Sequence, residues 1–388
     1  MKIAFVLDGV GTGGIERVGT QYVKLLTRLG HSVDLYNLKP QFAEMEKNYI
    51  DVNHIYHKKF SIWMMPDQYI LMVKRWWWGK YLYPICYAFS SILLYAYRMT
   101  MGRRKKYDLA IAFSGHFFDL NFITKNFVIS DKKLCWLHGS LMEYLVTAST
   151  YGDQYRKIKN LCVLSEANQN SALSMNKFMA NLNINHIYNP IDIENKNINF
   201  DHVNELKRQY GDFLLMIGRF ENDKDQKSII CAYKIMKDNN WCSDKLIFAG
   251  DGSTKMECIR LTEELGLQDD IVFVGNRTDV QDFYTAAKLF IHSSPAEGLP
   301  TVLLEAMKYG TPIVATRSMP GVEEILEGDT YGLQCNVADP EDIADKIRTM
   351  LDDEALQNHY IKQGNIRIQD FSYEKIREQL NYIIESLR

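Results

Sequence analysis

Short apolar runs that each lead into a turn and then an amphipathic stretch recur along this chain, and they restrict its fold more than any other feature. The first run, residues 2–8, has the composition of a buried parallel strand. A glycine-rich loop and an amphipathic helix over residues 15–29 follow it, and the next strand spans residues 31–38. This strand–helix–strand order predicts an α/β protein with doubly wound parallel sheets.

The same alternation continues along the chain and indicates two such sheets. Because 388 residues are too many for one ordinary core, we expect two domains with a polar link at residues 191–211. Residues 339–388 are expected to form three helices. Strands of the first sheet are expected at residues 107–114, 132–137, 161–165 and 186–188, and strands of the second at residues 213–217, 246–249, 271–275, 288–294, 312–316 and 332–335.

Charge is unevenly distributed between the two halves. Residues 1–200 carry 24 Lys and Arg against 15 Asp and Glu, whereas residues 201–388 carry 21 against 33. A basic first half indicates that one domain faces an anionic surface or ligand, and no DNA- or RNA-binding signature points to nucleic acid. Seven cysteines without a Cys-x-x-Cys pair or zinc spacing, and no secretory signal, predict a reducing cytoplasm.

The stretch from Ala296 to Glu305 carries the clearest chemistry. It follows an apolar run and opens a predicted helix, with Pro300 expected in the first turn and Gly310 past the end. Unpaired amides at the helix start favour a phosphate. The carboxylates of Glu297 and Glu305 only accept hydrogen bonds, as sugar hydroxyls require. Two isolated glutamates would more often be solvated surface acids.

This stretch resembles the Glu–seven residues–Glu signature of the retaining nucleotide-sugar glycosyltransferases of family 4, the glycosyl transferases group 1. The resemblance extends to the first twenty residues, the Gly218-Arg219 turn and residues 249–252 and 312–332, while residues 40–130 match poorly. It implies the GT-B architecture, in which two Rossmann-like domains face each other across a cleft. Residues 1–190, with residues 373–388 packing back on them, would form the acceptor-side domain, and residues 191–372 the donor-binding domain.

The resemblance also implies roles for individual residues. Glu297 would contact the donor sugar and Glu305 the ribose, while Arg219 and Lys224 would bind the diphosphate through a planar fork and a point charge. Asp225 stands where the family usually has glycine. The resemblance therefore does not determine the conformation of the turn at this position. The nucleobase would be held through backbone groups near Arg277. The full predicted donor site is Gly13, Gly14, Arg219, Lys224, Arg277, Glu297, Gly298, Leu299, Pro300, Thr301 and Glu305.

The first glycine loop allows two interpretations. Gly9, Gly11 and Gly14 match a dinucleotide fingerprint with Asp34 as the ribose acid, which is the basis of an alternative NAD-dependent oxidoreductase hypothesis. Asp34, however, lies inside its predicted strand. The segment from Gly13 to Arg17 is more similar to the Gly-Gly-x-Glu-Arg loop of family 4.

In that loop the glycines let the backbone approach the donor phosphate and the reacting sugar. Glu16 and Arg17 would lie on the acceptor side. His138, just past the strand at residues 132–137, lies on the ligand side of an open sheet. A histidine at a comparable place in the family contacts the donor sugar and would count with the catalytic residues. The alternative, which is about equally common, is a histidine that only makes hydrogen bonds within the fold.

The implied function is transfer of a hexose-type sugar, with retention, from a nucleotide sugar to a hydroxyl of a lipid-linked glycan acceptor. A UDP-sugar is expected from its frequency in the family, and the product would enter cell-surface polysaccharide or glycoconjugate synthesis. No Asp-x-Asp stands at a strand end, so neither a metal nor another cofactor is expected. Alternatives sharing the architecture are a sugar-nucleotide epimerase and a phosphorylase, which would use pyridoxal phosphate.

Residues 61–106 predict a membrane-surface segment. Trp76, Trp77 and Trp78 have basic neighbours, and the 17 uncharged residues 81–97 precede the basic cluster 103–106. A spanning helix needs about 20 apolar residues, and a crossing here would separate strands of one sheet. Trp, Tyr and basic residues suit the interface of an anionic membrane, which predicts a peripheral location on its cytoplasmic face. An aromatic-rich pair of core helices is the alternative.

Overall fold

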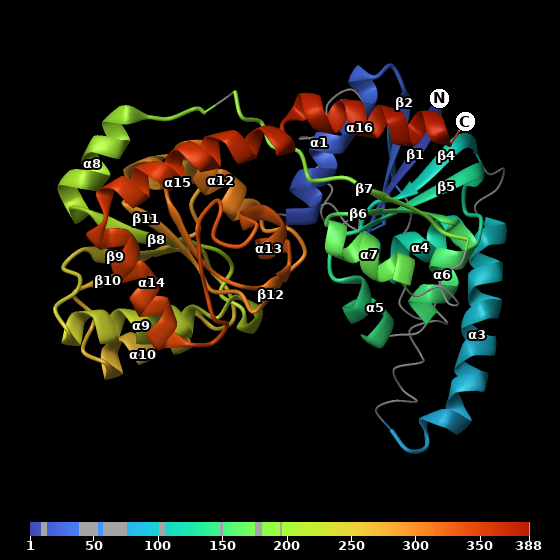
Figure 1. Cartoon of the computed structure of the whole chain (residues 1–388). Helices are drawn as coiled ribbons and strands as arrows, with labels where there is room; N and C mark the ends of the chain where they lie inside the picture. Colours follow the sequence, from blue (N-terminus) through green and yellow to red (C-terminus); the bar gives the residue numbers. More distant parts are fainter. Residues whose placement is uncertain are drawn as a thin grey trace. The chain divides into compact units, whose positions relative to one another are not determined.

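The computed structural model describes residues 1–8, 14–38, 53–56, 76–100, 105–147, 150–174, 181–194 and 196–387. The chain divides into two compact units, one comprising Met1–Pro190 and Ile376–Arg388 and the other Ile191–Lys375. Each unit is built on a parallel sheet with helices on its faces (Figure 1). The predicted α/β class with two doubly wound sheets is confirmed.

The first unit contains a seven-stranded sheet in the order β3-β2-β1-β4-β5-β6-β7. Every neighbouring pair is parallel. The order reverses between β1 and β4, which is therefore the switch point of this sheet. The strands are β1 (Lys2–Leu7), β2 (Ser32–Asn37), β3 (Asn53–Tyr56), β4 (Lys106–Ala112), β5 (Ile129–Leu137), β6 (Asn160–Val163) and β7 (Asn183–His186).

Helices cover both faces of this sheet. In Figure 1, α1 and α16 lie on one side and α4, α6 and α7 on the other. A single apolar core joins the sheet to α4 and α6, and Leu94 of α3 reaches it. The helices of this unit are α1 (Gly14–Arg28), α3 (Gly79–Thr100), α4 (Phe117–Thr124), α5 (Leu141–Thr147), α6 (Thr150–Ile158), α7 (Glu166–Ser174) and most of α16 (Tyr373–Ser386).

Asp34 is part of the interior of the first unit. It is buried in β2, where it accepts a hydrogen bond from the Tyr107 hydroxyl at 2.6 Å and lies 3.4 Å from Lys105 Nζ. A buried carboxylate requires such partners because burial penalises its charge. Asp34 therefore stabilises the contact between β2 and the start of β4. Its side chain is not exposed to receive a ribose.

The second unit contains a six-stranded sheet in the order β10-β9-β8-β11-β13-β15, with its switch point between β8 and β11. Helices α9, α10 and α14 share one apolar core on one face of the sheet. Its strands are β8 (Phe213–Ile217), β9 (Lys245–Ala249), β10 (Ile271–Gly275), β11 (Leu289–His292), β13 (Ile313–Thr316) and β15 (Leu333–Cys335). Its helices are α8 (Phe200–Tyr210), α9 (Gln226–Asp238), α10 (Lys255–Glu264), α11 (Val280–Ala286), α12 (Thr301–Tyr309), α13 (Gly321–Leu326), α14 (Pro340–Asp352) and α15 (Glu354–Arg367).

The expected polar link at residues 191–211 contains a helix, α8, that the sequence interpretation did not foresee. Asn199 caps this helix by accepting a hydrogen bond from the His202 backbone at 3.3 Å. Only Val203 and Leu206 of the helix are buried. Two buried side chains among eleven residues give the helix a narrow apolar face, and tertiary packing supplies the rest of the stability.

Two glycines hold the loop after β9 against the loop after β8. Gly250 has φ +145°, and a Cβ added there would lie 1.9 Å from the carbonyl oxygen of Gly218. At Gly252, with φ +156°, an added Cβ would lie 2.3 Å from the Phe220 carbonyl oxygen. Any larger residue would push these backbones apart. Gly250 and Gly252 thus fix the loop that carries Arg219.

We expect Gly250→Ala to lower the free energy of unfolding by about 2–4 kcal/mol, because the new methyl group meets backbone that cannot move aside. Gly218→Ala is the matched control, since an added Cβ at Gly218 meets nothing within 4 Å. Urea denaturation of both variants measures the difference. Equal stability of the two would show that this close approach is not required.

Candidate functional site

Charged side chains gather at the switch point of the second sheet. The loop after β8 carries Arg219 and Lys224, and the segment after β11 carries Glu297 and then α12. In an open α/β sheet the carboxyl ends of the two strands on either side of the switch point diverge and leave room for a ligand. These residues therefore occupy the position where such folds place their binding groups.

Lys224 and Glu297 form an ion pair, and the side chain of each is 17% exposed. Lys224 lies in a short 3-10 helix, Asn222–Lys224. The hydroxyl of Ser293, directly after β11, lies within donating distance of the carbonyls of Lys224 and Asp225, at 2.8 and 2.9 Å. The lysine loop is thereby tied to the strand that leads to Glu297. The structure thus brings together two of the predicted site residues that are 73 positions apart.

His292 is a third member of this group that the sequence interpretation missed. It is the last residue of β11 and is only 3% exposed, and its Nε2 lies 3.5 Å from the same Glu297 oxygen that contacts Lys224. Burial acts to raise the pKa of Glu297, but His292 and Lys224 outweigh it and lower that pKa to about 2. Glu297 is therefore ionised at neutral pH and can only accept hydrogen bonds.

The segment before α12 leaves backbone amides available to an anion. Pro300, expected in the first helical turn, is instead the N-cap residue, and α12 begins at Thr301. A proline side chain cannot cap, and the amides of Thr301 and Val302 make no hydrogen bond with any other residue that the structure describes. Such amides and the helix dipole favour a negatively charged group. Gly298 and Leu299 complete this segment.

A close backbone contact holds the Glu297 segment in place. Residues Ala296–Glu297 (β12) pair in parallel with Met319–Pro320 (β14). A Cβ added to Gly321 would lie 2.7 Å from the Gly298 carbonyl carbon and 2.8 Å from the Glu297 carbonyl oxygen. Gly321 is therefore needed for the approach of α13 to this segment, a constraint that the sequence interpretation did not draw from the Pro-Gly pair.

Glu305 lies one turn into α12, as predicted, and is held by a tyrosine. Tyr284 of α11 is fully buried, and its hydroxyl lies 3.2 Å from Glu305 Oε2 and 3.3 Å from the Val302 carbonyl. The phenol donates and these oxygens accept. Tyr284 thus fixes the direction of the Glu305 side chain. The sequence did not indicate that Tyr284 orients Glu305, because an aromatic residue on an amphipathic helix usually only packs in the core.

Arg219 is exposed, and its guanidinium makes no hydrogen bond or ion pair within the described ranges. Its backbone is nevertheless fixed, because Gln226 Nε2 donates to the Arg219 carbonyl at 2.7 Å. Asp225, found where the family usually has glycine, adopts the left-handed conformation with φ +47°. It also caps α9 through Ser228. Aspartate tolerates this conformation and is a good N-cap, so the turn survives without glycine.

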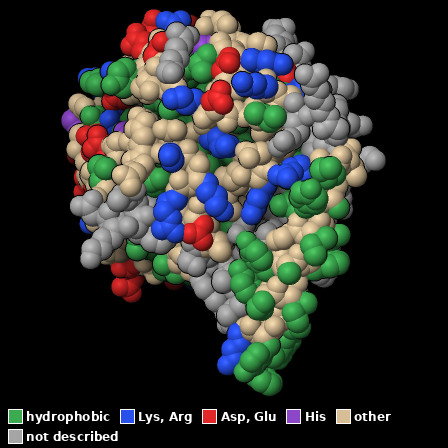
Figure 2. Space-filling view, turned by 90° about the vertical axis from the view of Figure 1, so that its right-hand side faces the viewer, with side chains coloured by type: hydrophobic (Ala, Val, Ile, Leu, Met, Phe, Trp, Pro, Cys, Tyr) green, Lys and Arg blue, Asp and Glu red, His purple; other side chains and the backbone are tan. Residues whose placement is uncertain are grey.

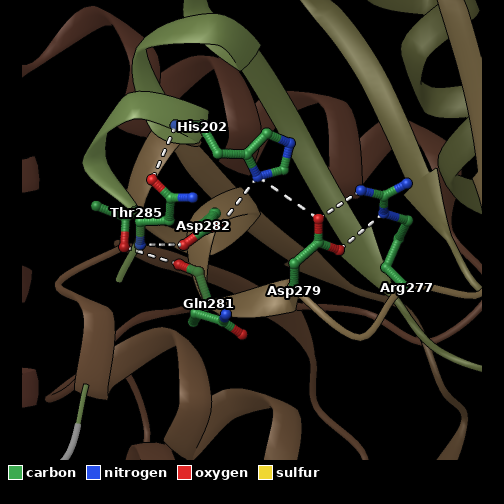
Figure 3. A network of polar contacts seen from close by, with 7 residues as sticks. His202, Arg277, Asp279, Gln281, Asp282 and Thr285 are labelled. Atoms are coloured by element: carbon green, nitrogen blue, oxygen red, sulfur yellow. Dashed lines mark hydrogen bonds and ion pairs between the residues drawn. The ribbon is translucent and has the colours of Figure 1, made fainter. Parts of the chain in front are cut away.

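Arg277, after β10, lies in a separate polar network (Figure 3). Its guanidinium makes two hydrogen bonds to the Asp279 carboxylate, one of them 2.8 Å from Nε. Nδ1 of His202 lies 3.5 Å from Asp279 and 2.9 Å from Asp282, which also accepts a hydrogen bond from the Asn199 backbone at 2.9 Å. This network joins α8 to α11. The Arg277 side chain is committed to Asp279, so the predicted nucleobase contact there would have to use backbone groups.

His202, Asp279 and Asp282 also offer three ligand atoms within 4.8 Å of one another, the one such group in the described part of the chain. Imidazole and carboxylate are suitable donors for several divalent metals. Each carboxylate already has an internal partner, since Asp279 binds Arg277 and Asp282 binds the Asn199 amide. The arrangement is fully explained as a clasp between two helices.

His138 follows β5 in the first unit, as predicted. Its Nε2 lies 2.7 Å from the Phe113 carbonyl. Because a carbonyl only accepts, Nε2 carries the hydrogen of the neutral ring and Nδ1 can accept a hydrogen bond. Burial lowers the pKa of His138 to about 4, although the bond to Phe113 raises it, while nearby His116 lowers it further. His138 is therefore neutral near pH 7.

A second pair at the switch point of the first sheet was also missed. Nδ1 of His116, after β4, lies 3.3 Å from Oδ2 of Asp8, after β1. The Ser114 hydroxyl accepts a hydrogen bond from the Asp8 backbone at 2.9 Å, which holds the two strand ends together. Asp8 is the last residue of the first predicted strand and His116 closely follows another, and the pairing of β1 with β4 brings these two strand ends together.

The predicted glycine loop is only partly described. Gly14 is the first residue of α1, outside the left-handed region, and an added Cβ would meet nothing within 4 Å. No contact within the described part of the chain therefore requires glycine at this position. Arg17 is exposed. Gly13 and the side chain of Glu16 lie outside the described residues, as do residues 61–75 and 101–104 of the predicted membrane segment.

Known proteins similar to this chain are glycosyltransferases. Residues 197–367, all in the second unit, match the model of the family described as glycosyl transferases group 1. Over 199 residues the chain is 28% identical to N-acetylgalactosamine-N,N'-diacetylbacillosaminyl-diphospho-undecaprenol 4-alpha-N-acetylgalactosaminyltransferase of Campylobacter jejuni. That match covers 51% of this chain and 53% of the relative, so the chain spans about half of that relative's length.

Two further matches cover nearly the whole chain. The amylovoran biosynthesis glycosyltransferase AmsD of Erwinia amylovora is 23% identical over 99% of both proteins. The crystal structure of Anabaena HepE in complex with UDP and glucose has a TM-score of 0.75 at 20% identity, with 100% of both chains covered. The fold is thus the GT-B architecture, and the relatives support a glycosyltransferase.

We expect the His138 ring to titrate near pH 4, well below an ordinary histidine, because burial disfavours its charged form. The unfolded chain binds a proton at about pH 6.5, so His138 should make folding less favourable as the pH falls from there towards 4. Two-dimensional NMR of the ring, assigned with His138→Gln, measures the titration. A histidine peptide in the same sample is the control, and parallel titration of the two would contradict the assignment.

Proposed function

We propose that this protein is a retaining glycosyltransferase that moves a hexose-type sugar from a UDP-sugar to a hydroxyl of a lipid-linked glycan. The observation that carries the proposal is the Lys224–Glu297 pair beside the free amides of α12, at the switch point of a unit that matches glycosyl transferases group 1. It combines groups for a diphosphate with a carboxylate that is ionised at neutral pH.

Each of these groups suits one part of a nucleotide sugar. Arg219, Lys224 and the amides of Thr301 and Val302 would hold the diphosphate. An ammonium group has three N–H donors, so Lys224 can keep Glu297 in place while it also binds a phosphate oxygen. Glu297 would accept hydrogen bonds from sugar hydroxyls, and Glu305 from the ribose.

The chemical step then needs no protein nucleophile. The bond between the anomeric carbon and the phosphate oxygen breaks, and a bond from the acceptor oxygen forms on the same face. The leaving phosphate accepts the hydroxyl proton of the acceptor. Positive charge that is already in place stabilises the developing diphosphate without reorganisation during the reaction. Arg219 and Lys224 therefore carry the largest share of the proposed catalysis.

We assign recognition of the sugar acceptor and of the reacting sugar to the first unit. A Cβ added at Gly14 would meet nothing within 4 Å, so we propose that the glycines of the Gly13-Gly14 loop serve the close approach of a ligand to the backbone. His138 presents an accepting nitrogen suited to a sugar hydroxyl, and Glu16 and Arg17 are proposed acceptor contacts. The Campylobacter relative is named for an undecaprenol-linked acceptor, which supports a lipid-linked glycan here.

A donor screen tests the proposal directly. Purified protein is incubated with a set of UDP-, GDP- and ADP-sugars, with and without a polyprenyl-diphosphate-linked sugar, and nucleotide release is measured. We expect release of UDP that depends on the acceptor. Consumption of the donor without any acceptor would favour an epimerase, and absorbance from bound pyridoxal phosphate would favour a phosphorylase.

We expect Arg219→Ala and Glu305→Ala each to lower the rate of transfer by roughly tenfold to over a hundredfold while the protein stays folded. Each removes a charged hydrogen-bonding partner of the donor, which costs about 1.5–3 kcal/mol. Arg260→Ala and Glu263→Ala, at exposed positions of α10, are the matched controls. Activity within about twofold of the unchanged protein for either site variant would remove it from the donor site.

We also propose catalysis without a metal, because the positive charge for the diphosphate comes from Arg219 and Lys224. Dialysis against EDTA should leave the rate unchanged, whereas a metal that neutralised the diphosphate would be lost. The measurement is the rate before and after dialysis, with Mg²⁺ and Mn²⁺ added back. A loss of activity that either ion restores would falsify this part of the proposal.

A further inference from the structure

Helix α3 exposes most of its apolar side chains. Of its 22 residues only Gly79, Ser90 and Leu94 are buried. Six large hydrophobic side chains of the helix are between 55% and 66% exposed: Tyr81, Ile85, Phe89, Ile92, Tyr95 and Met99. A soluble protein rarely leaves so many neighbouring apolar groups in water without a use for them.

These six side chains form one continuous stripe. At about 100° per residue they fall within a sector roughly 120° wide. Gly79, Ser90 and Leu94 lie on the opposite side, where Leu94 joins the core of the first unit. Figure 2 shows hydrophobic side chains along the whole projecting length of this helix. The stripe, which we call the α3 stripe, is therefore directed away from the sheet.

The tryptophans before α3 extend the exposed apolar surface. The rings of Trp76 and Trp78 stack with their centroids 4.8 Å apart. Trp77 between them is 83% exposed, the largest exposure of any large hydrophobic side chain in the described part of the chain. Tryptophan prefers the interface between water and lipid, where its ring is partly immersed.

Positive charge borders the α3 stripe. Residues 68–107 contain eight Lys and Arg and no Asp or Glu. Lys80 and Arg98 are 18 residues apart, which is about five helical turns, so they lie on the same flank of the helix. Lys80 Nζ lies 5.0 Å from the Tyr81 ring and the Arg98 guanidinium 5.4 Å from the Tyr95 ring. These cations can keep their charge at a polar surface while the stripe beside them is buried.

We propose that α3 binds flat on an anionic lipid bilayer, with the α3 stripe in the acyl boundary and Lys80 and Arg98 among the headgroups. In the part of the chain that the structure describes, no helix is long and apolar enough to cross a membrane. The combination of an amphipathic face, interfacial aromatics and unopposed positive charge matches an interfacial helix. A protein partner would need a strongly acidic apolar groove to give the same complementarity.

The proposal does not depend on catalysis, so it can fail or succeed independently of the proposed glycosyl transfer. The test is flotation of the full chain with vesicles of phosphatidylcholine alone or mixed with phosphatidylglycerol. The stripe variant carries Tyr81→Gln, Ile85→Gln and Ile92→Gln. A matched control replaces three equally exposed hydrophobic residues elsewhere, Phe200, Ile366 and Tyr382, with glutamine.

We expect the unchanged protein and the control to float with the mixed vesicles, and the stripe variant to bind about a hundredfold more weakly. Lys80→Gln should weaken binding roughly fivefold on the mixed vesicles only. Thermal unfolding is measured in parallel, and both triple variants should keep the melting temperature of the unchanged protein.

Three results would overturn the proposal. The first is failure of the unchanged protein to bind mixed vesicles. The second is undiminished binding by the stripe variant. The third is a melting temperature that falls in the stripe variant alone, since the stripe would then be packed against protein. Conversion of a dimer to a monomer by the stripe variant, seen by light scattering without vesicle binding, would assign the stripe to a second copy of the chain.

Discussion

A parallel strand can be joined to its parallel neighbour only by a connection that returns across the face of the sheet. In each unit this constraint places helices on both faces and gathers every strand's carboxyl end at one edge. Where the strand order reverses, between β1 and β4 in one unit and between β8 and β11 in the other, two loops diverge. The charged groups described above all follow those strands: Lys224, Glu297, Asp8 and His116. The strand order therefore determines which of these side chains come together.

Within the second unit, electrostatics and backbone geometry reinforce each other. Burial acts to raise the pKa of Glu297, and His292 and Lys224 outweigh that effect. Ser293 ties the lysine loop to β11, and Gly321 lets α13 approach the glutamate segment. These charged groups are therefore held in place by contacts within the protein, and the binding of a ligand need not also order them.

The sequence was informative wherever a periodic pattern or a turn residue determined the structure. The strands of both sheets other than β3, the start of α12 and the position of Glu305 follow from apolar runs, Pro300 and Gly310. In contrast, α8 was hidden because its polar residues outnumber its two buried ones. Strand β3, an edge strand of four residues, gave too short a pattern to recognise.

Contacts between distant residues could not be predicted from local patterns. The proximity of His292 to Glu297 depends on how β11 leads into β12, and the hold of Tyr284 on Glu305 depends on the packing of α11 against α12. Arg277 was correctly singled out as following a strand, but nothing in its neighbourhood indicated that Asp279 would bind its side chain. Side-chain orientation of this kind is decided by tertiary packing.

Helix α16 begins in the second unit and supplies Ile376, Leu380, Ile383 and Ile384 to the interior of the first. The first unit is therefore assembled from the two ends of the chain, with the whole second unit inserted between them. A ribosome releases residues 1–190 long before residue 376, so the apolar surface that α16 covers stays uncovered until the last residues of the helix have been made. An uncovered apolar surface of this kind is one that a chaperone would recognise.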